Sequence, residues 1–178
     1  MIKAGIIGAG KIAERHISGY KRFGVEIVIT DADDGVAERI GRDYSINIVK
    51  SSEEIFDDPG LEIIDVCTPV TTHKDIILEA VKKKKHVFCE KPLCLNLNEA
   101  YQIKGAAENA EKLLMVGYLY RFHPAFQKVK EWLDGGLIGK PYFGIFRIGQ
   151  EIYLVFRCHL KGFPFLFFPP YELNPKFY

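Results

Sequence analysis

The segment Gly8-Ala9-Gly10-Lys11-Ile12-Ala13 is the feature that most narrows the folds open to this chain. It follows the apolar run Ile2–Ile7, which predicts a buried strand, and opens Lys11–Phe23, whose apolar spacing predicts a helix. In such a unit, the first glycine permits a tight turn, the second lets a phosphate approach the backbone, and a small third residue allows close helix packing. The N–H groups of the first helical turn favour negative charge. The loop therefore predicts a dinucleotide site, with these candidate binding residues: Gly8, Gly10, Lys11 and Ile12.

An acid at the end of the second predicted strand supports this interpretation. Val25–Thr30 is a β-branched run, and Asp31 follows it. A carboxylate about 20 residues after the glycines accepts hydrogen bonds from the ribose hydroxyls of NAD. The segment 30–34 holds three acids and neither Arg nor Lys, whereas a 2′-phosphate needs a nearby arginine. We therefore predict NAD as the cofactor, with NADP as a possible alternative.

Strand and helix patterns alternate along the first 120 residues. Such alternation is typical of right-handed crossovers and a mainly parallel sheet, whose strands are apolar because both faces are covered. We therefore predict an α/β fold, a doubly wound parallel sheet of the Rossmann type. The expected strands are Ile2–Ile7, Val25–Thr30, Ile46–Val49, Leu61–Cys67, His86–Cys89 and Leu113–Gly117, and the expected helices are Lys11–Phe23, Asp33–Tyr44, Thr71–Lys84 and Asn98–Glu111.

Composition argues against several classes of partner. The net charge is +1 and the pI is about 7.7, so there is no basic footprint for nucleic acid or for an anionic membrane. No apolar stretch approaches the roughly 20 residues of a membrane span, and no signal peptide is visible. The four cysteines lack metal-ligand spacing, so we expect no metal and reduced thiols in a cytoplasmic protein.

Two further segments with candidate site residues lie at the ends of predicted strands. Cys67-Thr68-Pro69 closes one, and Glu90-Lys91-Pro92 closes the next along the chain. Ligands of open α/β sheets bind outside the carboxyl ends of the strands, so both segments belong to the expected site. A lysine there can polarise a substrate oxygen and carry a proton if burial lowers its pKa. Taken alone, Lys91 could equally be a solvated loop lysine.

Three segments resemble the Gfo/Idh/MocA oxidoreductases, the family of glucose–fructose oxidoreductase and inositol dehydrogenase. They read GIIGAGKIAERH at the start, CTPVTTHKDIILEAVKKKKHVFCEKPL in the middle and VGYLYRFHPAFQ from Val116. The resemblance covers about residues 1–149. It implies NAD(P)-dependent hydride transfer to or from a carbon of a sugar, a sugar derivative or a polyol.

The resemblance also implies roles for individual residues. Glu90-Lys91-Pro92 matches the family's EKP motif, in which the lysine reaches the reacting hydroxyl and the glutamate faces the cofactor. Lys91 is thus the candidate catalytic residue, and the bond before Pro92 is often cis in relatives. The residues that would lie beside the cofactor are Thr68, Pro69, His73, Glu90 and Lys91. For His73 the alternative is a histidine that makes local hydrogen bonds at a helix N-terminus.

A third group of residues lies where the Rossmann pattern stops. By the same resemblance, Tyr118, Arg121 and His123 would line the substrate cleft. Arg121 could equally pair with a carboxylate at a domain junction. We expect residues 1–120 to form the NAD(P)-binding domain and residues 121–150 to begin an incomplete α+β substrate domain, with a helix over Pro124–Asp134 and a strand over Tyr142–Ile148.

Residues 151–178 form an atypical tail. They hold six of the 13 phenylalanines and only two acids, and the run Phe163–Pro170 has neither strand nor helix periodicity. The family often carries an Asp-x-x-x-His pair in its substrate domain, which is absent here. We therefore expect a truncated relative with weak or no activity. A frameshift would produce such a tail, and so would a short protein whose tail packs on a sheet edge or on another copy of the chain.

Three functions remain open from the sequence. The first is a dehydrogenase acting on a sugar or polyol, with Lys91 assisting proton transfer. The second is a nucleotide-binding module without turnover. The third is an interaction protein that docks through its aromatic tail and forms a homo-oligomer.

Overall fold

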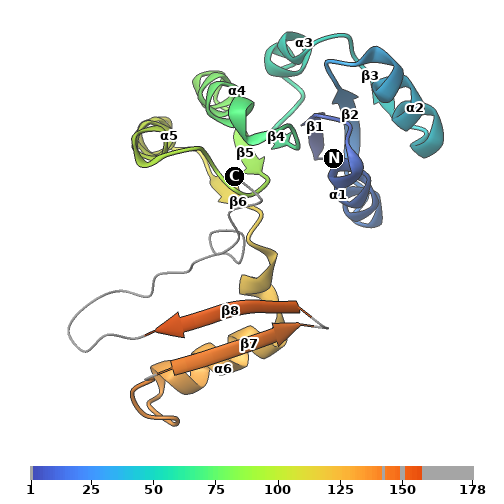
Figure 1. Ribbon diagram of the computed structural model, residues 1–178. Coiled ribbons are helices and arrows are strands. Elements are labelled where there is room, and N and C mark those ends of the chain that lie inside the picture. The colour runs from blue at the N-terminus through green and yellow to red at the C-terminus, as the bar shows by residue number, and fades with distance from the viewer. Residues whose placement is uncertain (1, 142, 149–150, 158–178) are drawn as a thin grey trace. The chain divides into compact units, whose positions relative to one another are not determined.

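The computed structural model describes residues 2–141, 143–148 and 151–157, which fall into two compact units. The first unit ends at Tyr118, and the second begins at Leu119 (Figure 1).

The first unit is built on a six-stranded parallel sheet in the order β3-β2-β1-β4-β5-β6. The chain moves outward from β1 in one direction and then returns to add β4 on the other side, which is the doubly wound arrangement. This confirms the Rossmann-type fold predicted from the sequence. The strands are β1 (Lys3–Ile7), β2 (Glu26–Thr30), β3 (Asn47–Ile48), β4 (Ile63–Val66), β5 (His86–Cys89) and β6 (Leu114–Val116).

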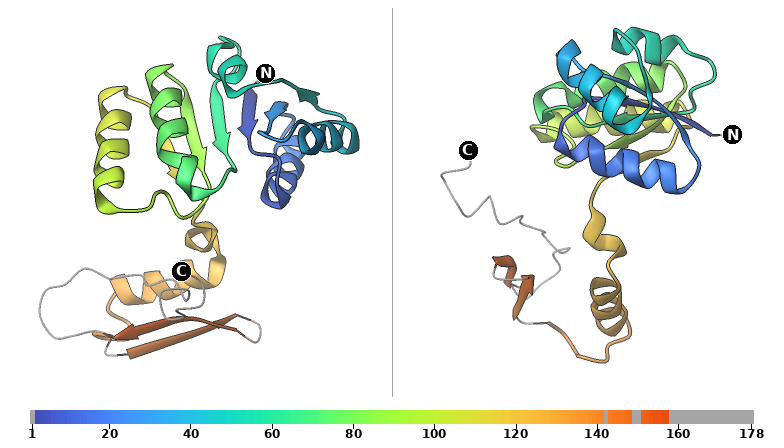
Figure 2. Two further views of the ribbon diagram at one scale, coloured as in Figure 1. Left: turned by 45° about the horizontal axis from the view of Figure 1, so that its top comes forward. Right: turned by 90° about the vertical axis from the view of Figure 1, so that its right-hand side faces the viewer.

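Helices cover both faces of this sheet (Figure 2). Ile6 of β1 packs with the helices of one face, whereas its neighbour Ile7 belongs to the cluster on the other, as the alternation of side chains along a strand requires. Ile17 and Ile77 are fully buried, one in each cluster, and each such side chain contributes about 1.5–3 kcal/mol. The first face carries α1 (Lys11–Arg22) and α2 (Asp34–Tyr44), and the second carries α3 (Ser52–Asp57), α4 (Val70–Lys82) and α5 (Leu97–Asn109).

Helix α3 was not expected from the sequence. Ser51 caps it by accepting a hydrogen bond from the backbone N–H of Glu54 at 3.4 Å, and Glu54 in turn accepts one from the N–H of Lys50 at 3.1 Å. Its six residues are too few to show a helical period, so the capping residues were the only available signal. Ile55 and Phe56 fix the helix by burying their side chains in the core.

The second unit combines a short 3₁₀ helix, η1 (Leu119–Phe122), with α6 (Pro124–Asp134) and a two-stranded sheet. Helix α6 has the predicted bounds, and the ring of His123 caps it by accepting from the N–H of Ala125. Strand β7 (Phe143–Ile148) pairs antiparallel with β8 (Glu151–Arg157). The compositionally atypical tail thus begins with strand β8, which was not predicted, and its Phe163–Pro170 run lies outside the described residues.

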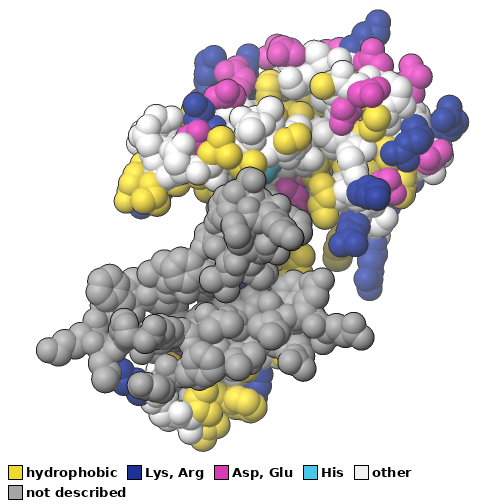
Figure 3. Space-filling model, in the orientation of Figure 1, with side chains coloured by type: hydrophobic (Ala, Val, Ile, Leu, Met, Phe, Trp, Pro, Cys, Tyr) yellow, Lys and Arg dark blue, Asp and Glu magenta, His cyan; other side chains and the backbone are white. Residues whose placement is uncertain are grey.

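Apolar side chains are exposed on the first unit around α5 (Figure 3). Leu97 and Tyr101 of this helix are 74% and 70% exposed, and Leu113, beside the edge strand β6, is 75% exposed. Within the described ranges, no helix has both the length and the apolar character needed to cross a membrane.

Candidate cofactor-binding site

Four strands of the first unit end at the same level. Ile7 of β1 is paired with Thr30 of β2 and with Val66 of β4, and Val66 is paired with Cys89 of β5. The residues that follow these four positions therefore gather along one edge of the sheet. They are the glycine loop, Asp31, Thr68-Pro69 and the Glu90-Lys91-Pro92 turn.

The glycine loop leaves its backbone accessible at that edge. Gly8 has a φ of 98°, and a Cβ built on it would lie 2.8 Å from the carbonyl carbon of Cys67, so no other residue fits without displacing the backbone that follows β4. A Cβ on Gly10 would meet nothing within 4 Å, and no side chain caps α1 at this residue. The N-terminus of α1 therefore faces open space with no capping side chain, which is the environment that a diphosphate requires at a helix N-terminus.

Asp31 lies directly against the glycine loop. Its Oδ2 accepts a hydrogen bond from the N–H of Ala9 at 2.6 Å, and its Oδ1 accepts one from Asp33 at 2.9 Å. Lys11, the first residue of α1, is exposed, whereas Ile12 packs partly against the core. The structure thus brings the carboxylate and the loop together, while Ile12 contributes packing as well as its backbone.

His73 is buried, with 1% of its surface exposed, between the two loops that follow β4 and β5. Its Nε2 lies 2.8 Å from the carbonyl oxygen of Thr68, and its Nδ1 lies 3.0 Å from that of Pro92 and 3.3 Å from Sγ of Cys89. The ring therefore links the two loops. Of the two roles considered for His73, this geometry favours local hydrogen bonding, since the ring is enclosed by protein atoms.

The Glu90-Lys91-Pro92 turn contains a cis peptide bond between Lys91 and Pro92. Lys91 is exposed, and its backbone N–H donates to Oε2 of Glu90 at 3.1 Å. Gly117 makes room for Glu90, because a Cβ on Gly117 would lie 2.9 Å from Oε1 of that side chain. The exposed Lys91 at the carboxyl edge of the sheet can reach a substrate there, and the carboxylate of Glu90 beside it is only 12% exposed.

A buried polar cluster behind the glycine loop was missed by sequence reasoning. His16, on the second turn of α1, places Nδ1 2.8 Å from Oδ2 of Asp65 and Nε2 3.3 Å from Oε1 of Glu90. Asp65 is fully buried, and the side chains of His16 and Glu90 are each 12% exposed. Burial favours the neutral imidazole and lowers the pKa of His16. The hydrogen bonds and negative charges of Asp65 and Glu90 together have a larger effect, so this pKa is raised above its ordinary value. The available signal was an aspartate inside the otherwise apolar strand β4.

The thiols around this cluster remain protonated. Burial, with Asp65 and Glu90 nearby, raises the pKa of Cys67 and raises that of Cys89 to about 12. Neither thiol is therefore poised as a nucleophile. Ligand atoms of His16, Asp65 and Cys67 lie within 4.8 Å of one another, but hydrogen bonds among the three already occupy them.

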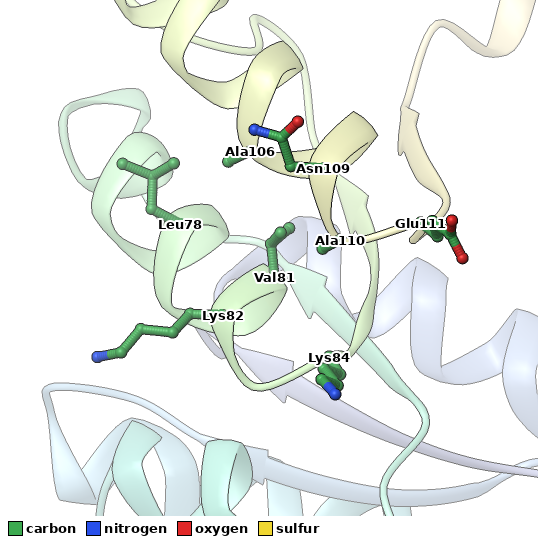
Figure 4. Close-up of a pocket in the computed structure, with 8 residues that line it drawn as sticks. All are labelled: Leu78, Val81, Lys82, Lys84, Ala106, Asn109, Ala110 and Glu111. Atoms are coloured by element: carbon green, nitrogen blue, oxygen red, sulfur yellow. The ribbon is translucent and has the colours of Figure 1, made fainter.

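The predicted substrate residues are split between the two units. Tyr118 ends the first unit and is half-exposed, whereas Arg121 and His123 are exposed residues of the second. Their part in a substrate cleft stays a prediction. A groove between α4 and α5, lined in part by Val81 and Ala110, lies near the C-terminal ends of these helices (Figure 4). It is at the opposite edge of the sheet from the glycine loop and contains none of the predicted site residues.

Comparison with known proteins agrees with this geometry. Residues 2–118 match the model of the Gfo/Idh/MocA oxidoreductase family with an NAD-binding Rossmann fold. The chain is 32% identical over 147 residues to myo-inositol 2-dehydrogenase of Thermotoga maritima and 32% identical over 148 residues to the NAD⁺-dependent scyllo-inositol 2-dehydrogenase of Bacillus subtilis. These alignments cover 79% and 80% of the chain, but the chain spans only 43% of the length of either relative.

Solved structures give the same result. A probable dehydrogenase from Thermotoga maritima aligns with a TM-score of 0.74 at 32% identity, over 79% of this chain and 43% of that one. Levoglucosan dehydrogenase, in complex with NADH and levoglucosan, aligns with a TM-score of 0.72 at 27% identity, over 78% of this chain and 40% of that one. The glycine loop, the carboxylate beside it and the family match over 2–118 lead to one conclusion: this chain belongs to the Gfo/Idh/MocA oxidoreductase family and carries its NAD-binding Rossmann domain.

Proposed function

We propose that this chain binds NAD(H) for an oxidoreductase that acts on a polyol or a sugar derivative. Bound NAD supplies the acceptor or donor of a hydride. In this proposal the glycine loop holds the diphosphate, Asp31 accepts hydrogen bonds from the adenosine ribose, and Lys91 exchanges a proton with the substrate hydroxyl. The substrate class follows the inositol and levoglucosan dehydrogenases that the chain resembles.

One observation carries the proposal. The in-register ends of β1, β2, β4 and β5 bring the glycine loop, Asp31 and Lys91 to one edge of the sheet. Ligands bind at this edge in open α/β sheets, and the reversal of strand order between β1 and β4 opens the crevice there. Asp31 also favours NAD over NADP, because its carboxylate would repel a 2′-phosphate.

Cofactor binding is the first test. We expect NADH fluorescence to titrate saturably with the full chain and NADPH to bind more weakly. Asp31→Ala should weaken NADH binding about tenfold or more, because the ribose loses its acceptor. Asp57→Ala is the matched control, since this acid pairs with Lys83 at the far edge of the sheet and should leave the affinity unchanged. Failure of the unaltered chain to bind either cofactor would overturn the proposal.

Turnover is tested separately on the same preparations. NADH formation from NAD⁺ would be followed with myo-inositol, scyllo-inositol and levoglucosan as substrates. Any turnover should fall at least 100-fold in Lys91→Met, because the proton carrier is lost, while NADH affinity changes little. NADH binding without turnover on any of these compounds would instead favour the nucleotide-binding module.

A further inference from the structure

We propose that His16 is a positioning residue of the cofactor site, whose ring joins the glycine-loop helix to Asp65 and Glu90 and thereby fixes the Glu90-Lys91-Pro92 turn. The inference rests on the proposed cofactor function and adds a residue to it. His16 lies on α1, Asp65 on β4 and Glu90 directly after β5. One imidazole ring thus connects three elements that converge at the site.

The two contacts of the ring require both of its nitrogens. Nδ1 lies 2.8 Å from Asp65 and Nε2 lies 3.3 Å from Glu90, and both partners are carboxylates. A neutral imidazole carries one N–H, so only the charged ring presents a hydrogen to each side. The ring of Phe88 lies 5.2 Å from that of His16 and limits its rotation. The orientation of His16 is therefore set by its surroundings.

Glu90 is held from several directions as a result. Oε1 faces His16, Oε2 accepts from the backbone N–H of Lys91, and Gly117 leaves the space that the carboxylate fills. If His16 loses its charge, Glu90 loses its ion-pair partner while remaining largely buried. A carboxylate in that state moves toward solvent, and the adjoining backbone of Lys91 is hydrogen-bonded to it. The position of the turn is thus coupled to the charge on His16.

The remaining titratable groups around the ring stay neutral over the same pH range. Tyr20, on the next turn of α1, lies beside Asp65, and its pKa is raised by burial and by that carboxylate. Cys67 contacts Nδ1 at 3.4 Å, and its pKa is raised for the same reasons. His16, rather than Tyr20 or Cys67, is therefore the group that changes charge near neutral pH.

Two substitutions separate its two contacts. The amide nitrogen of asparagine mimics Nδ1 of histidine, so His16→Asn keeps the hydrogen bond to Asp65 and loses the contact with Glu90. The longer His16→Gln places its amide nitrogen where Nε2 lies, so it keeps the contact with Glu90 and loses the one with Asp65. We expect NADH titration of the full chain to show about a tenfold loss of affinity for His16→Asn and a smaller loss for His16→Gln. The unaltered chain should lose affinity as pH rises through the pKa of His16, and both variants should show a flat profile.

Three further variants of the chain, His86→Asn, a double variant and Gly117→Ala, test the role of His16. His86→Asn removes a histidine at the opposite edge of the sheet and should change affinity less than about twofold. Combining His16→Asn with Glu90→Gln should weaken binding no more than either change alone, because both break one contact. If His16→Asn does not fold, Gly117→Ala displaces Glu90 without altering His16 and should give the same loss. Wild-type affinity in His16→Asn overturns this inference alone, while failure of the unaltered chain to bind NADH overturns it together with the proposed function.

Discussion

Gly117 shows how a single missing side chain positions a charged one. A Cβ there would lie 2.9 Å from Oε1 and 3.3 Å from Cδ of Glu90, so Gly117→Ala must displace the carboxylate from its position beside His16. We expect urea unfolding to show a free energy of unfolding about 1–2 kcal/mol lower than that of the unaltered chain. The loss is moderate because the added methyl meets the end of a flexible side chain, which can move, and not the backbone. Gly105→Ala is the control, since a Cβ at this position of α5 meets nothing within 4 Å and should stabilise the chain by about 0.5–1 kcal/mol. Equal effects of the two substitutions would contradict the argument.

At this scale, the sequence predicted the residues whose role depends on local geometry. Gly8 and Gly10 could be recognised because a strand precedes them and a helix follows, and the spacing of Asp31 follows from the length of that helix. His16 and Asp65 could not be paired in the same way, since they are far apart in the sequence and meet only because α1 packs beside β4. The isolated acid in β4 indicated a buried partner, because an unpaired buried charge is costly, but did not identify it.

At the scale of elements, His73 couples the β4–α4 loop to the turn after β5. His73→Leu would remove the ring that lies within hydrogen-bond distance of the carbonyl oxygens of Thr68 and Pro92. We expect the variant to lose about 1–1.5 kcal/mol of unfolding free energy, because the hydrogen-bonded link between the two loops is lost. Glu79→Ala, which removes a surface ion pair with Lys82 on the same helix, should cost less than about 0.5 kcal/mol. A loss in His73→Leu no larger than in this control would show that the ring does not bridge the loops.

Element prediction succeeded for helices of several turns and for the apolar strand β5. Strand β5 and helix α6 have the predicted bounds, and α4 begins one residue earlier than Thr71. Short helices were harder to predict, because the six-residue α3 and the four-residue 3₁₀ helix η1 contain too little sequence to show a helical period. Strand β8 was missed for a different reason, since its pairing with β7 is a tertiary property that neither strand reveals by itself.

At the scale of the whole molecule, the two units can be observed independently. The chain has one tryptophan, Trp132, which lies on α6 of the second unit. Its fluorescence therefore reports unfolding of the second unit, while amide hydrogen exchange of peptides within residues 2–118 reports the first. An effect of His16 should be confined to the first unit, and Trp132 provides an internal control in the same sample.

The raised pKa of His16 makes the stability of the first unit depend on pH with a definite sign. The folded state holds the imidazolium proton more tightly than the unfolded state, whose histidine titrates near 6.5. The contribution of His16 is therefore complete below about pH 6.5 and is lost as pH rises through the higher folded value. The raised pKa values of Cys67, Cys89 and Tyr20 act in the same direction, but only near and above their unfolded values of 9.0 for the thiols and 10.0 for the phenol. Between about pH 6 and 8, hydrogen exchange should show that the stability advantage of the unaltered chain over His16→Gln shrinks, while the Trp132 transition stays the same in both proteins. A constant difference across this range would mean that His16 holds the same charge in the folded and unfolded states. Its contacts with Asp65 and Glu90 would then contribute to stability through packing and not through its charge.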